Sequence, residues 1–459
     1  MSEPVIVWFR RDLRLSDQAA LAAAAREGPV VPVYVLDDET PRHRAMGGAS
    51  RWWLHHSLKR LDESLRAKGA RLILRRGKSE QVLTELAKEI GATRIHALHH
   101  YEPWWRNAEK AVGEKLDLRL HDGNYLLPPG TVRTGSGGMY KIYTPFWRAL
   151  SEHMPPPEPV RTPARIETPA TWPDSDALED WALLPVKPDW ATGFAEEWTP
   201  GEDGARARVA SFIDEAAAYE ERRNIPSVEG TSRLSPHLHF GEVSPAYVWH
   251  RLHDAGGSVE TFLKELVWRD YAQNLICQFP AYGKENGRAQ FDALPWRDLR
   301  EAKGDFAAWK CGMTGYPIVD AGMRELWATG WMHNRVRMIA ASFLIKHLLV
   351  DWRHGEQWFW DTLVDADYAS NATNWQWVAG SGVDANIFTR IMAPLTQSPK
   401  FDAGDYIRRW VPELAHIRGD AIHDPEEYGC RPAKYPAKIV EHREGRERAL
   451  AAFSRIKGG

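Results

Sequence analysis

The stretch Asp365-Ala-Asp-Tyr-Ala-Ser-Asn371-Ala-Thr-Asn-Trp375-Gln-Trp377-Val-Ala-Gly-Ser-Gly-Val-Asp384, running on to Arg390, is the part of the chain around which the rest is organised. Carboxylates at alternate positions stand beside an Asn and two Trp in a segment rich in Gly, Ser and Asn, a composition typical of a loop. A loop does not need tryptophan, so Trp375 and Trp377 either fill a corner of a core or face a flat aromatic ligand. The rest of the chain favours the ligand.

Composition restricts the class of protein. The 459 residues predict two or three domains, and 43% hydrophobic with 26% charged residues is typical of a soluble globular protein. We find no apolar run of the roughly 20 residues that a membrane helix needs, and no signal peptide. The cysteines Cys277, Cys311 and Cys430 show no CxxC pairing, which excludes a disulfide framework and a zinc or iron–sulfur site. We expect a protein of the reducing cytoplasm.

Net charge and tryptophan content restrict the class of protein further. A net charge of −3 argues against a protein that coats nucleic acid indiscriminately, although it allows a local basic patch. The chain has 22 Trp, most of them beyond Trp190. This concentration indicates either an aromatic-lined pocket or a very large helical core.

Strands and helices alternate through the first part of the chain, which predicts a parallel α/β sheet with helices on both faces. No GxGxxG motif follows the first strand, so we do not expect an ordinary dinucleotide site there. The expected strands are Val5–Phe9, Val30–Leu36, Arg71–Leu74 and Arg94–Leu98, with Leu118–His121 as a candidate fifth, and the expected helices are Gln18–Ala25, Arg51–Ala67, Ser79–Ile90 and one starting at Pro103.

A proline-rich linker and a helical region follow. Residues from Leu127 to about Trp198 have little periodicity and are expected to be extended, apart from a short helix over Tyr140–Leu150. We therefore divide the chain into a 1–130 α/β domain, a 131–198 linker and a 199–459 helical domain. The helices expected in that domain are Ala205–Tyr219, Pro245–His253, Val259–Cys277, Asp305–Trp309, Ile318–Ala328, Met332–Val350, Gly355–Leu363 and Asp405–Trp410.

Two of these helices carry unusual faces. Glu265, Trp268 and Arg269 stand at i, i+3 and i+4, and Asn334, Arg337 and Met338 have the same spacing. A carboxylate, an indole, two guanidiniums, an amide and a thioether are more typical of the walls of a polar-aromatic cavity than of a core stripe. The alternative for each set is a solvated face with one stray tryptophan.

Hydroxyl groups cluster in Thr231-Ser-Arg-Leu-Ser235, directly before Pro236. Such a cluster at a helix start suits a phosphate or diphosphate, although Ser and Thr there also serve as helix caps. His237 and His239 lack further ligands at useful spacing, so we expect no metal site.

Several long motifs occur in order along nearly the whole chain: Trp8-Phe-Arg-Arg-Asp-Leu-Arg14, Tyr219, Thr231–Ser235, Glu265-Leu-Val-Trp-Arg-Asp270, Thr314-Gly-Tyr-Pro-Ile-Val-Asp320, Trp331-Met-His-Asn-Arg-Val-Arg-Met338 and Asn374-Trp-Gln-Trp377. They resemble the DNA photolyase/cryptochrome family, and most narrowly its class I cyclobutane pyrimidine dimer (CPD) photolyases. The resemblance implies a Rossmann-like parallel-sheet antenna domain, a long linker and an all-helical domain that binds FAD.

The resemblance also implies roles for residues around the FAD. Arg337 and Asp365 would form an ion pair beside the isoalloxazine, Asp367 would lie on its polar edge, and Asn371 would face flavin N5. Fixed donors and cations suit a flavin anion. The full set implied to bind FAD is Tyr219, Thr231, Ser232, Arg233, Leu234, Ser235, Arg269, Asn334, Arg337, Asp365, Asp367 and Asn371.

The implied reaction is driven by light and produces no net redox change. Excited FADH⁻ would give an electron to a pyrimidine dimer flipped out of UV-damaged DNA, the cyclobutane ring would open, and the electron would return. Trp268 and Trp377 would sandwich the dimer, Met338 would line its pocket, and a protonated Glu265 would donate a hydrogen bond to a thymine carbonyl. Residues implied near the DNA backbone are Arg223, Asn334, Arg335, Gln397 and Lys400.

Three tryptophans match the family's photoreduction chain, in the order Trp375, Trp352 and Trp296, with Trp296 at the surface. Trp309 competes with Trp296 for the last place. The alternative is that all of them are core residues.

The second, light-harvesting chromophore of the family is less clear from the motifs. The segment Tyr101-Glu-Pro-Trp-Trp-Arg-Asn107 lacks the Asn-Glu pair of folate-binding relatives, which leaves a deazaflavin, a flavin, a folate or an empty site, with Arg51 and Glu102 as candidate contacts. We expect a monomer in the cytoplasm, and the resemblance implies that it is associated with the nucleoid when it repairs DNA. The functional alternatives are a photosensory cryptochrome, a (6-4) photolyase and a flavin oxidoreductase with no role in DNA repair.

Overall fold

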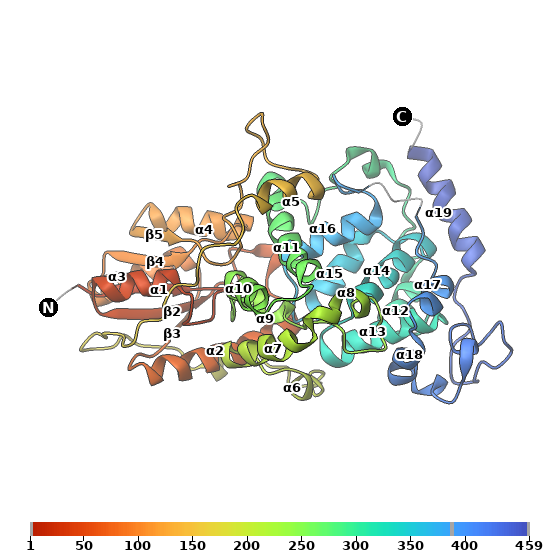
Figure 1. The fold of residues 1–459 in the computed structure, drawn as a ribbon, viewed down its shortest axis with the longest axis horizontal. Helices are drawn as coiled ribbons and strands as arrows, with labels where there is room; N and C mark the ends of the chain where they lie inside the picture. The colour runs from red at the N-terminus through yellow and green to blue at the C-terminus, as the bar shows by residue number, and fades with distance from the viewer. Residues whose placement is uncertain (1–2, 386–389, 457–459) are drawn as a thin grey trace.

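The computed structural model describes residues 3–385 and 390–456. It begins with a five-stranded parallel sheet in the order β3-β2-β1-β4-β5 (Figure 1). Every residue of β1 and β2 is buried, as expected for strands covered by helices on both faces. The expected α/β fold of this part is confirmed, including the fifth strand. The strands are β1 (Val5–Phe9), β2 (Val30–Leu36), β3 (Ile73–Arg76), β4 (Arg94–Leu98) and β5 (Asp117–His121).

One strand is shifted from its expected place. The apolar pattern predicted Arg71–Leu74, whereas β3 is Ile73–Arg76 and pairs Ile73 with Val33 of β2. The Leu72 N–H donates to the Asp62 carboxylate instead of to a neighbouring strand, at 2.8 Å. Strand ends are set by this register, which the local pattern does not contain. The helices and short turns of this part are α1 (Ala19–Glu27), η1 (Arg42–Arg44), α2 (Gly48–Ala67), α3 (Ser79–Ile90) and α4 (Pro103–Gly113).

The segment between β5 and α7 (Glu202–Glu215) is mostly irregular, as its proline content predicted. Its main helix is α5 (Tyr143–Ser151), close to the expected range, with η2 (Leu178–Trp181) and α6 (Phe194–Glu197) further along. In Figure 1, α5 lies against α11 (Glu260–Gln278), and the two helices are in contact. This segment therefore connects the two parts and also packs on the second one.

The remainder is helical, which confirms the expected second part of the fold. The short helix α9 (Ser235–His239), the helix α17 (Pro394–Lys400) with Pro399 inside it, and the C-terminal helix α19 (His442–Ile456) were not expected from periodicity. The remaining elements are η3 (Ala216–Ala218), α8 (Tyr219–Arg222), α9 (Ser235–His239), α10 (Pro245–Ala255), η4 (Ala289–Ala293), α12 (Lys303–Lys310), α13 (Pro317–Thr329), α14 (Asn334–Ser342), η5 (Phe343–His347), α15 (Trp352–Thr362), α16 (Tyr368–Ala379), α17 (Pro394–Lys400), α18 (Gly404–Trp410), η6 (Pro412–Leu414), η7 (Gly419–Ile422) and α19 (His442–Ile456).

The organising stretch is not a loop, contrary to the prediction. Its centre forms α16, which begins at Asp367, whose carboxylate accepts a hydrogen bond from the Ser370 N–H at 2.7 Å, and ends at Gly380 in the left-handed conformation. Both are ordinary helix boundary signals. The helix is stabilised by burial among its neighbours, and tertiary packing of this kind overrides the turn-like composition. Residues 386–389 at its far end lie outside the described part of the chain.

A second correction concerns the helix expected over Met332–Val350. The α-helix α14 ends at Ser342, and the next five residues, Phe343–His347, form a π-helical turn. In this turn the Leu348 N–H donates to the Phe343 carbonyl, five residues back, at 3.1 Å. His347 Nε2 then lies 2.8 Å from Nδ1 of His442 on α19, so the turn is also where the C-terminal helix docks.

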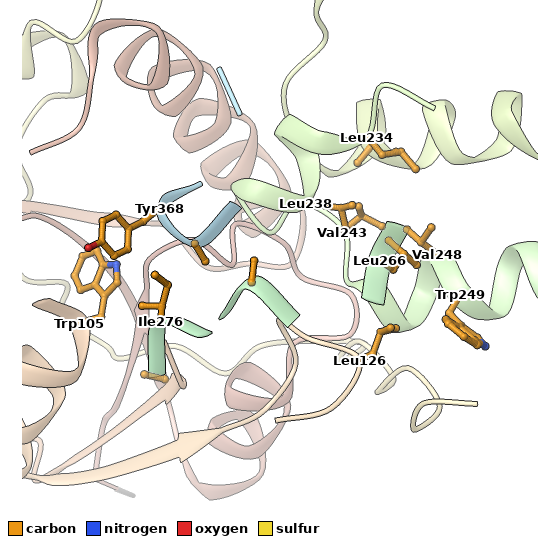
Figure 2. Packing of buried hydrophobic residues seen from close by; sticks show 14 of the residues in the cluster. Trp105, Leu126, Leu234, Leu238, Val243, Val248, Trp249, Leu266, Ile276 and Tyr368 are labelled. Atoms are coloured by element: carbon orange, nitrogen blue, oxygen red, sulfur yellow. The ribbon is translucent and has the colours of Figure 1, made fainter. Parts of the chain in front are cut away.

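One hydrophobic core joins the two parts of the chain. Buried residues of the sheet part, such as Trp105, belong to the same cluster as Tyr368 of α16 and Ile276 of α11, and Figure 2 shows these three side chains close together. Within residues 3–385 and 390–456, no helix is both long enough and apolar enough to cross a membrane.

Candidate functional site

A cavity of about 510 Å³ opens inside the helical part. It is bounded by the faces of α11, α14 and α16 and by the loop before α9, and it contains both of the unusual helix faces found in the sequence. The sequence-derived candidates that line it are Tyr219, Arg223, Thr231, Ser232, Arg233, Leu234, Ser235, Glu265, Trp268, Arg269, Asn334, Arg335, Arg337, Met338, Asp365, Asp367 and Trp377.

The loop at residues 231–235 presents a cation to one end of the cavity. Arg233 has a positive φ of 52°, a conformation that is uncommon outside glycine and often found at functional sites. Its guanidinium lies over the rings of Trp331 and Trp198, at 4.5 and 4.9 Å, and pairs with Glu197. Its buried Nε has no hydrogen-bond partner within the described residues. This end of the cavity can therefore accept an anion.

The middle of the cavity holds a bidentate ion pair. Arg337 Nη2 and Nη1 donate to the two oxygens of Asp365 at 2.8 and 3.1 Å. Arg337 Nε also donates to the Met332 carbonyl at 2.7 Å, so the guanidinium plane is fixed at three points. Such a fork is rigid and offers the remaining N–H groups of Arg337 to a ligand without reorganisation.

Asp367 is a carboxylate that stays ionised. Its burial opposes ionisation, but the nearby His239, Arg269 and Arg11 hold the pKa of Asp367 below its ordinary value, with His239 Nδ1 3.9 Å from the carboxylate. Burial in turn lowers the pKa of His239 to about 4. Arg11 comes from the sheet part, with Nη1 3.8 Å from the Asp367 carboxylate. Asp367 thus links the helix α16 to the first part of the chain.

Arg269 is held on the cavity wall by backbone carbonyls. Its Nη1 donates to Asn124 at 2.6 Å and its Nη2 to Leu238 at 3.2 Å. The guanidinium also lies 4.7 Å from the centre of the Tyr125 ring. Because its hydrogen-bond partners are neutral carbonyls, the charge of Arg269 is left to act on anions in the cavity, among them Asp367.

Two indoles reach the same cavity from different helices. Trp268 stands on α11 and Trp377 on α16, and α11 packs against α16. Trp268 is 39% exposed, which is unusual for a residue of its size. Flat, exposed aromatic surface inside a cavity is suited to stacking on another ring.

Glu265 and Arg223 form an ion pair at the cavity, with Oε1 and Nη1 2.5 Å apart. Burial raises the pKa of Glu265, while Arg223 acts to lower it, and the net direction is upward. Arg335 stands nearby, bonded to Asn224 at 2.6 Å and stacked on Phe401 at 4.6 Å.

The short helix α17 extends this basic edge. The Lys400 ammonium lies 5.5 Å from the centre of the same Phe401 ring that carries Arg335. Gln397 belongs to α17 as well but does not line the cavity. The structure therefore brings Arg223, Arg335 and Lys400 toward one rim.

Asn371 is not among the described residues that line the cavity. Its side-chain amide donates to the backbone carbonyl and to Oε1 of Glu356, at 3.0 and 2.9 Å. Glu356 is fully buried and also receives two hydrogen bonds from Arg44, at 2.6 and 2.9 Å. The Asn371 amide is thus fixed in one orientation by a buried carboxylate.

The tryptophans expected in the photoreduction chain lie in the core behind α16. Trp375 is buried against Phe359, with ring centres 5.0 Å apart, and Trp352 is fully buried. Trp296 is partly buried. Trp309 has no exposed surface and lies 6.4 Å from Trp375, so it is a neighbour of the first position and not a solvent-facing end.

The two antenna candidates are not brought together. Arg51 pairs with Asp38 at the surface of the sheet part, whereas Glu102 is buried and pairs with Arg11 at 3.1 Å. Within the described residues, no group of three His, Cys, Asp or Glu side chains forms a metal-ligand cluster.

Comparison with known proteins identifies the family to which the chain belongs. The family model for the "FAD binding domain of DNA photolyase" matches residues 262–455, and the "DNA photolyase" model matches residues 5–164. The chain belongs to the DNA photolyase family. It is 50% identical to the deoxyribodipyrimidine photo-lyase of Agrobacterium fabrum over 99% of this chain and 98% of that protein, and 37% identical to that of Escherichia coli over 99% of each. The expected family, fold class and enzyme type are confirmed.

Solved structures agree with this assignment. A bacterial class III photolyase from Agrobacterium tumefaciens matches with a TM-score of 0.95 and 49% identity, over 100% of this chain and 98% of that one. A cryptochrome from Synechocystis matches with a TM-score of 0.87 and 28% identity, over 98% of this chain and 99% of that one. The expected likeness to class I stays a prediction, since the first neighbour is described as class III.

Sequence reasoning missed several residues of the site. Asp384 lines the cavity, Arg44 and Glu356 orient Asn371, and Tyr143 lies against Trp268. Arg44, Glu356 and Tyr143 are far apart in sequence from the side chains they contact, and no local spacing connects them.

Proposed function

We propose that this photolyase repairs cyclobutane pyrimidine dimers in UV-damaged DNA, using light absorbed by a bound FAD. The observation that carries the proposal is the meeting of two indoles, the exposed Trp268 and the half-buried Trp377, at the cavity that also holds the Arg337–Asp365 fork. A flipped-out pyrimidine dimer and a flavin would then occupy neighbouring parts of one cavity.

The residues present fit FAD. The unpartnered Nε of Arg233, with the hydroxyls of Thr231 and Ser232, would hold the diphosphate. Arg337 and Arg269 would place positive charge beside the flavin ring, which favours a reduced, anionic flavin. Asp365 and Asp367 would accept hydrogen bonds from the ring's polar edge. Asn371 stays the proposed partner of N5, although in this structure its amide is bonded to Glu356 and it does not line the cavity.

When bound, reduced FAD supplies an excited-state electron to the dimer and takes it back after the ring has opened. The protein's own side chains position the lesion. Trp268 and Trp377 stack on the two pyrimidines, Met338 fills the remaining apolar wall, and Glu265 hydrogen-bonds a thymine carbonyl. Since the pKa of Glu265 is raised by burial, loss of its Arg223 partner to a DNA phosphate would favour the protonated, donating form.

The basic edge of the cavity would bind the DNA backbone. Arg223, Arg335 and Lys400 lie along it, with Asn334 and Gln397 as polar neighbours. Phosphate contacts of this kind fix orientation, while the cavity recognises the damage. We also retain Trp375, Trp352 and Trp296 as the proposed route by which the flavin is photoreduced.

A light-harvesting chromophore in the sheet part completes the proposal. An archaeal photolyase from Sulfolobus tokodaii, with a TM-score of 0.84 and 29% identity, is described as containing two FAD molecules and as implying a novel light-harvesting cofactor. Deazaflavin, flavin and folate all remain candidates for this chain, and we assign no residues to the chromophore.

The chief alternative is a photosensory cryptochrome. Cryptochrome-1 of Arabidopsis thaliana is 36% identical over 98% of this chain and 70% of that protein. Two indoles available for stacking favour repair, because a light sensor has no need to bind a flipped base.

Dimer binding separates the two functions. The FAD-loaded protein should bind an oligonucleotide with one thymine dimer more tightly than the undamaged one, measured in the dark. Trp377→Ala should weaken dimer binding roughly 5- to 150-fold, the value of one base–aromatic stack. Trp327→Phe is a matched control, because Trp327 is 50% exposed but does not line the cavity. Equal affinity of the unmodified protein for both oligonucleotides would rule out repair.

A further inference from the structure

Tyr143, the first residue of α5, covers one face of Trp268. The two rings are parallel within 3°, and their centres are 3.4 Å apart. This is van der Waals contact over the whole ring, so nothing else can stack on that face of the indole.

The covered face is the one turned away from the cavity. Trp268 lines the cavity, whereas Tyr143 is not among the described residues that line it. Tyr271 meets both rings edge-on, 5.6 Å from Tyr143 and 5.7 Å from Trp268, and prevents the stacked pair from tilting toward it. Trp268 is therefore left with one usable face, and that face looks into the cavity.

Hydrogen bonds fix Tyr143 both at its backbone and at its hydroxyl group. Its backbone N–H donates to the Asp384 carboxylate at 3.1 Å, and the same oxygen accepts from the Tyr271 hydroxyl at 3.0 Å. Its own hydroxyl donates to the carbonyl of Lys264, one helical turn before Trp268 on α11, at 3.2 Å. The phenol is thus attached to the helix that carries the indole it covers.

We propose that Tyr143 is a positioning residue for lesion recognition, which holds the Trp268 indole as a fixed plate for one pyrimidine ring. The inference rests on the proposed function, since it concerns the same cavity. An exposed tryptophan with two free faces would rotate, and binding a lesion would then have to immobilise it. With Tyr143 behind it, the indole is already oriented before DNA arrives. The helix α5 contributes none of the described residues that line the cavity. Through Tyr143 it would nevertheless contribute to recognition of the damage.

Dissociation constants for dimer-containing and undamaged oligonucleotides test the proposal. Tyr143→Leu should weaken dimer binding roughly 5- to 10-fold and leave binding of undamaged DNA unchanged, since an ordered plate matters only to a stacked lesion. Tyr143→Phe keeps the ring and should bind the dimer within about twofold of the unmodified protein. Tyr140→Leu, in the same segment but packed on Phe146, is the control for general damage to the linker. Unchanged dimer binding by Tyr143→Leu, or an equal loss for both oligonucleotides, would overturn the proposal.

A measurement without DNA separates failure of this inference from failure of the proposed function. In protein labelled with 5-fluorotryptophan, the Trp268 fluorine signal, assigned by its loss in Trp268→Phe, should be a single sharp line shifted upfield by the ring current of Tyr143. A broad line, or one at the unstacked position, would overturn the positioning role even if Tyr143→Leu does not fold. A sharp upfield line in a protein that does not select the dimer would contradict only the proposed function.

Discussion

Glu265 shows how one residue changes its task when its partner changes. In the DNA-free protein it pairs with Arg223 at 2.5 Å, which favours the carboxylate, while burial raises its pKa. We propose that DNA binding shifts this balance toward the acid form. Glu265→Gln keeps a hydrogen-bond donor in place, so the repair quantum yield should fall by no more than about tenfold, the value of one hydrogen bond.

The measurement is the quantum yield of dimer splitting at saturating protein, compared between Glu265→Gln, Glu265→Ala and the unmodified enzyme. Glu265→Ala removes the donor and should lose more than Glu265→Gln. Collapse of Glu265→Gln to near zero would count against a neutral donor.

At the scale of single residues, the sequence correctly predicted the placement of side chains that have a regular local spacing. Glu265, Trp268 and Arg269 share a helix face, and their spacing was enough to place them on one cavity wall. The contacts of Tyr143 with Trp268 and of Asn371 with Glu356 depend on packing between segments far apart in the chain. No period in the sequence encodes such contacts.

Among the elements, α11 is both a cavity wall and an anchor for the linker. One oxygen of its buried Asp270 accepts hydrogen bonds from the N–H groups of Leu126 and Leu127, at 2.9 and 3.2 Å, while its other oxygen has no partner within the described residues. Burial raises the pKa of Asp270 to about 7. The folded protein therefore holds a proton that the unfolded chain releases near pH 4.

A stability measurement against pH follows from this shift. Between about pH 4 and pH 7 the folded state binds more protons than the unfolded state at Asp270, so this group lowers the stability as the pH rises. In Asp270→Asn the amide nitrogen takes the position of the oxygen that has no partner, and the side chain no longer titrates. The free energy of unfolding in urea should therefore fall less steeply from pH 5 to pH 8 in Asp270→Asn than in the unmodified protein. Glu325, whose pKa is also raised to about 7, is present in both proteins and cancels in the comparison. Identical slopes would show that Asp270 titrates normally.

Helix and strand prediction succeeded where period and boundary signals agreed. The strands β1, β2 and β4 and the helix α3 have the expected ends. Prediction failed at α16, because the Ser, Asn and Gly of the surrounding stretch indicated a loop although Asp367 and Gly380 are proper helix boundary residues. Burial on several sides, which the local sequence does not display, stabilises that helix.

At the scale of the whole molecule, the sheet part supports the cavity with buried charge. The order of strands reverses between β1 and β4, where related α/β folds bind a nucleotide. Here that edge is filled by Arg10, bonded to Glu109 at 2.7 Å, and by Arg11, which reaches toward Asp367. Arg44 crosses the same junction to Glu356. We infer that the two parts do not function as independent modules.

Removing one of these junction charges should be costly. Arg44→Met would leave Glu356 buried without its cation and should lower the free energy of unfolding by about 3–5 kcal/mol. The double variant Arg44→Met, Glu356→Gln removes the charge pair and should recover part of that loss, as measured by urea denaturation. Stability of Arg44→Met equal to that of the unmodified protein would mean that the junction is not held by this pair.

The most direct test of the account is photorepair by the purified protein itself. FAD-loaded protein, reduced and kept without oxygen, is mixed with an oligonucleotide containing one thymine dimer and exposed to blue light, with a dark sample and a Trp377→Ala sample beside it. We predict that intact thymines appear only in the light, many per protein molecule, and that Trp377→Ala repairs far less at limiting DNA. Dimers that persist under illumination, in a protein shown to hold reduced FAD, would contradict the account.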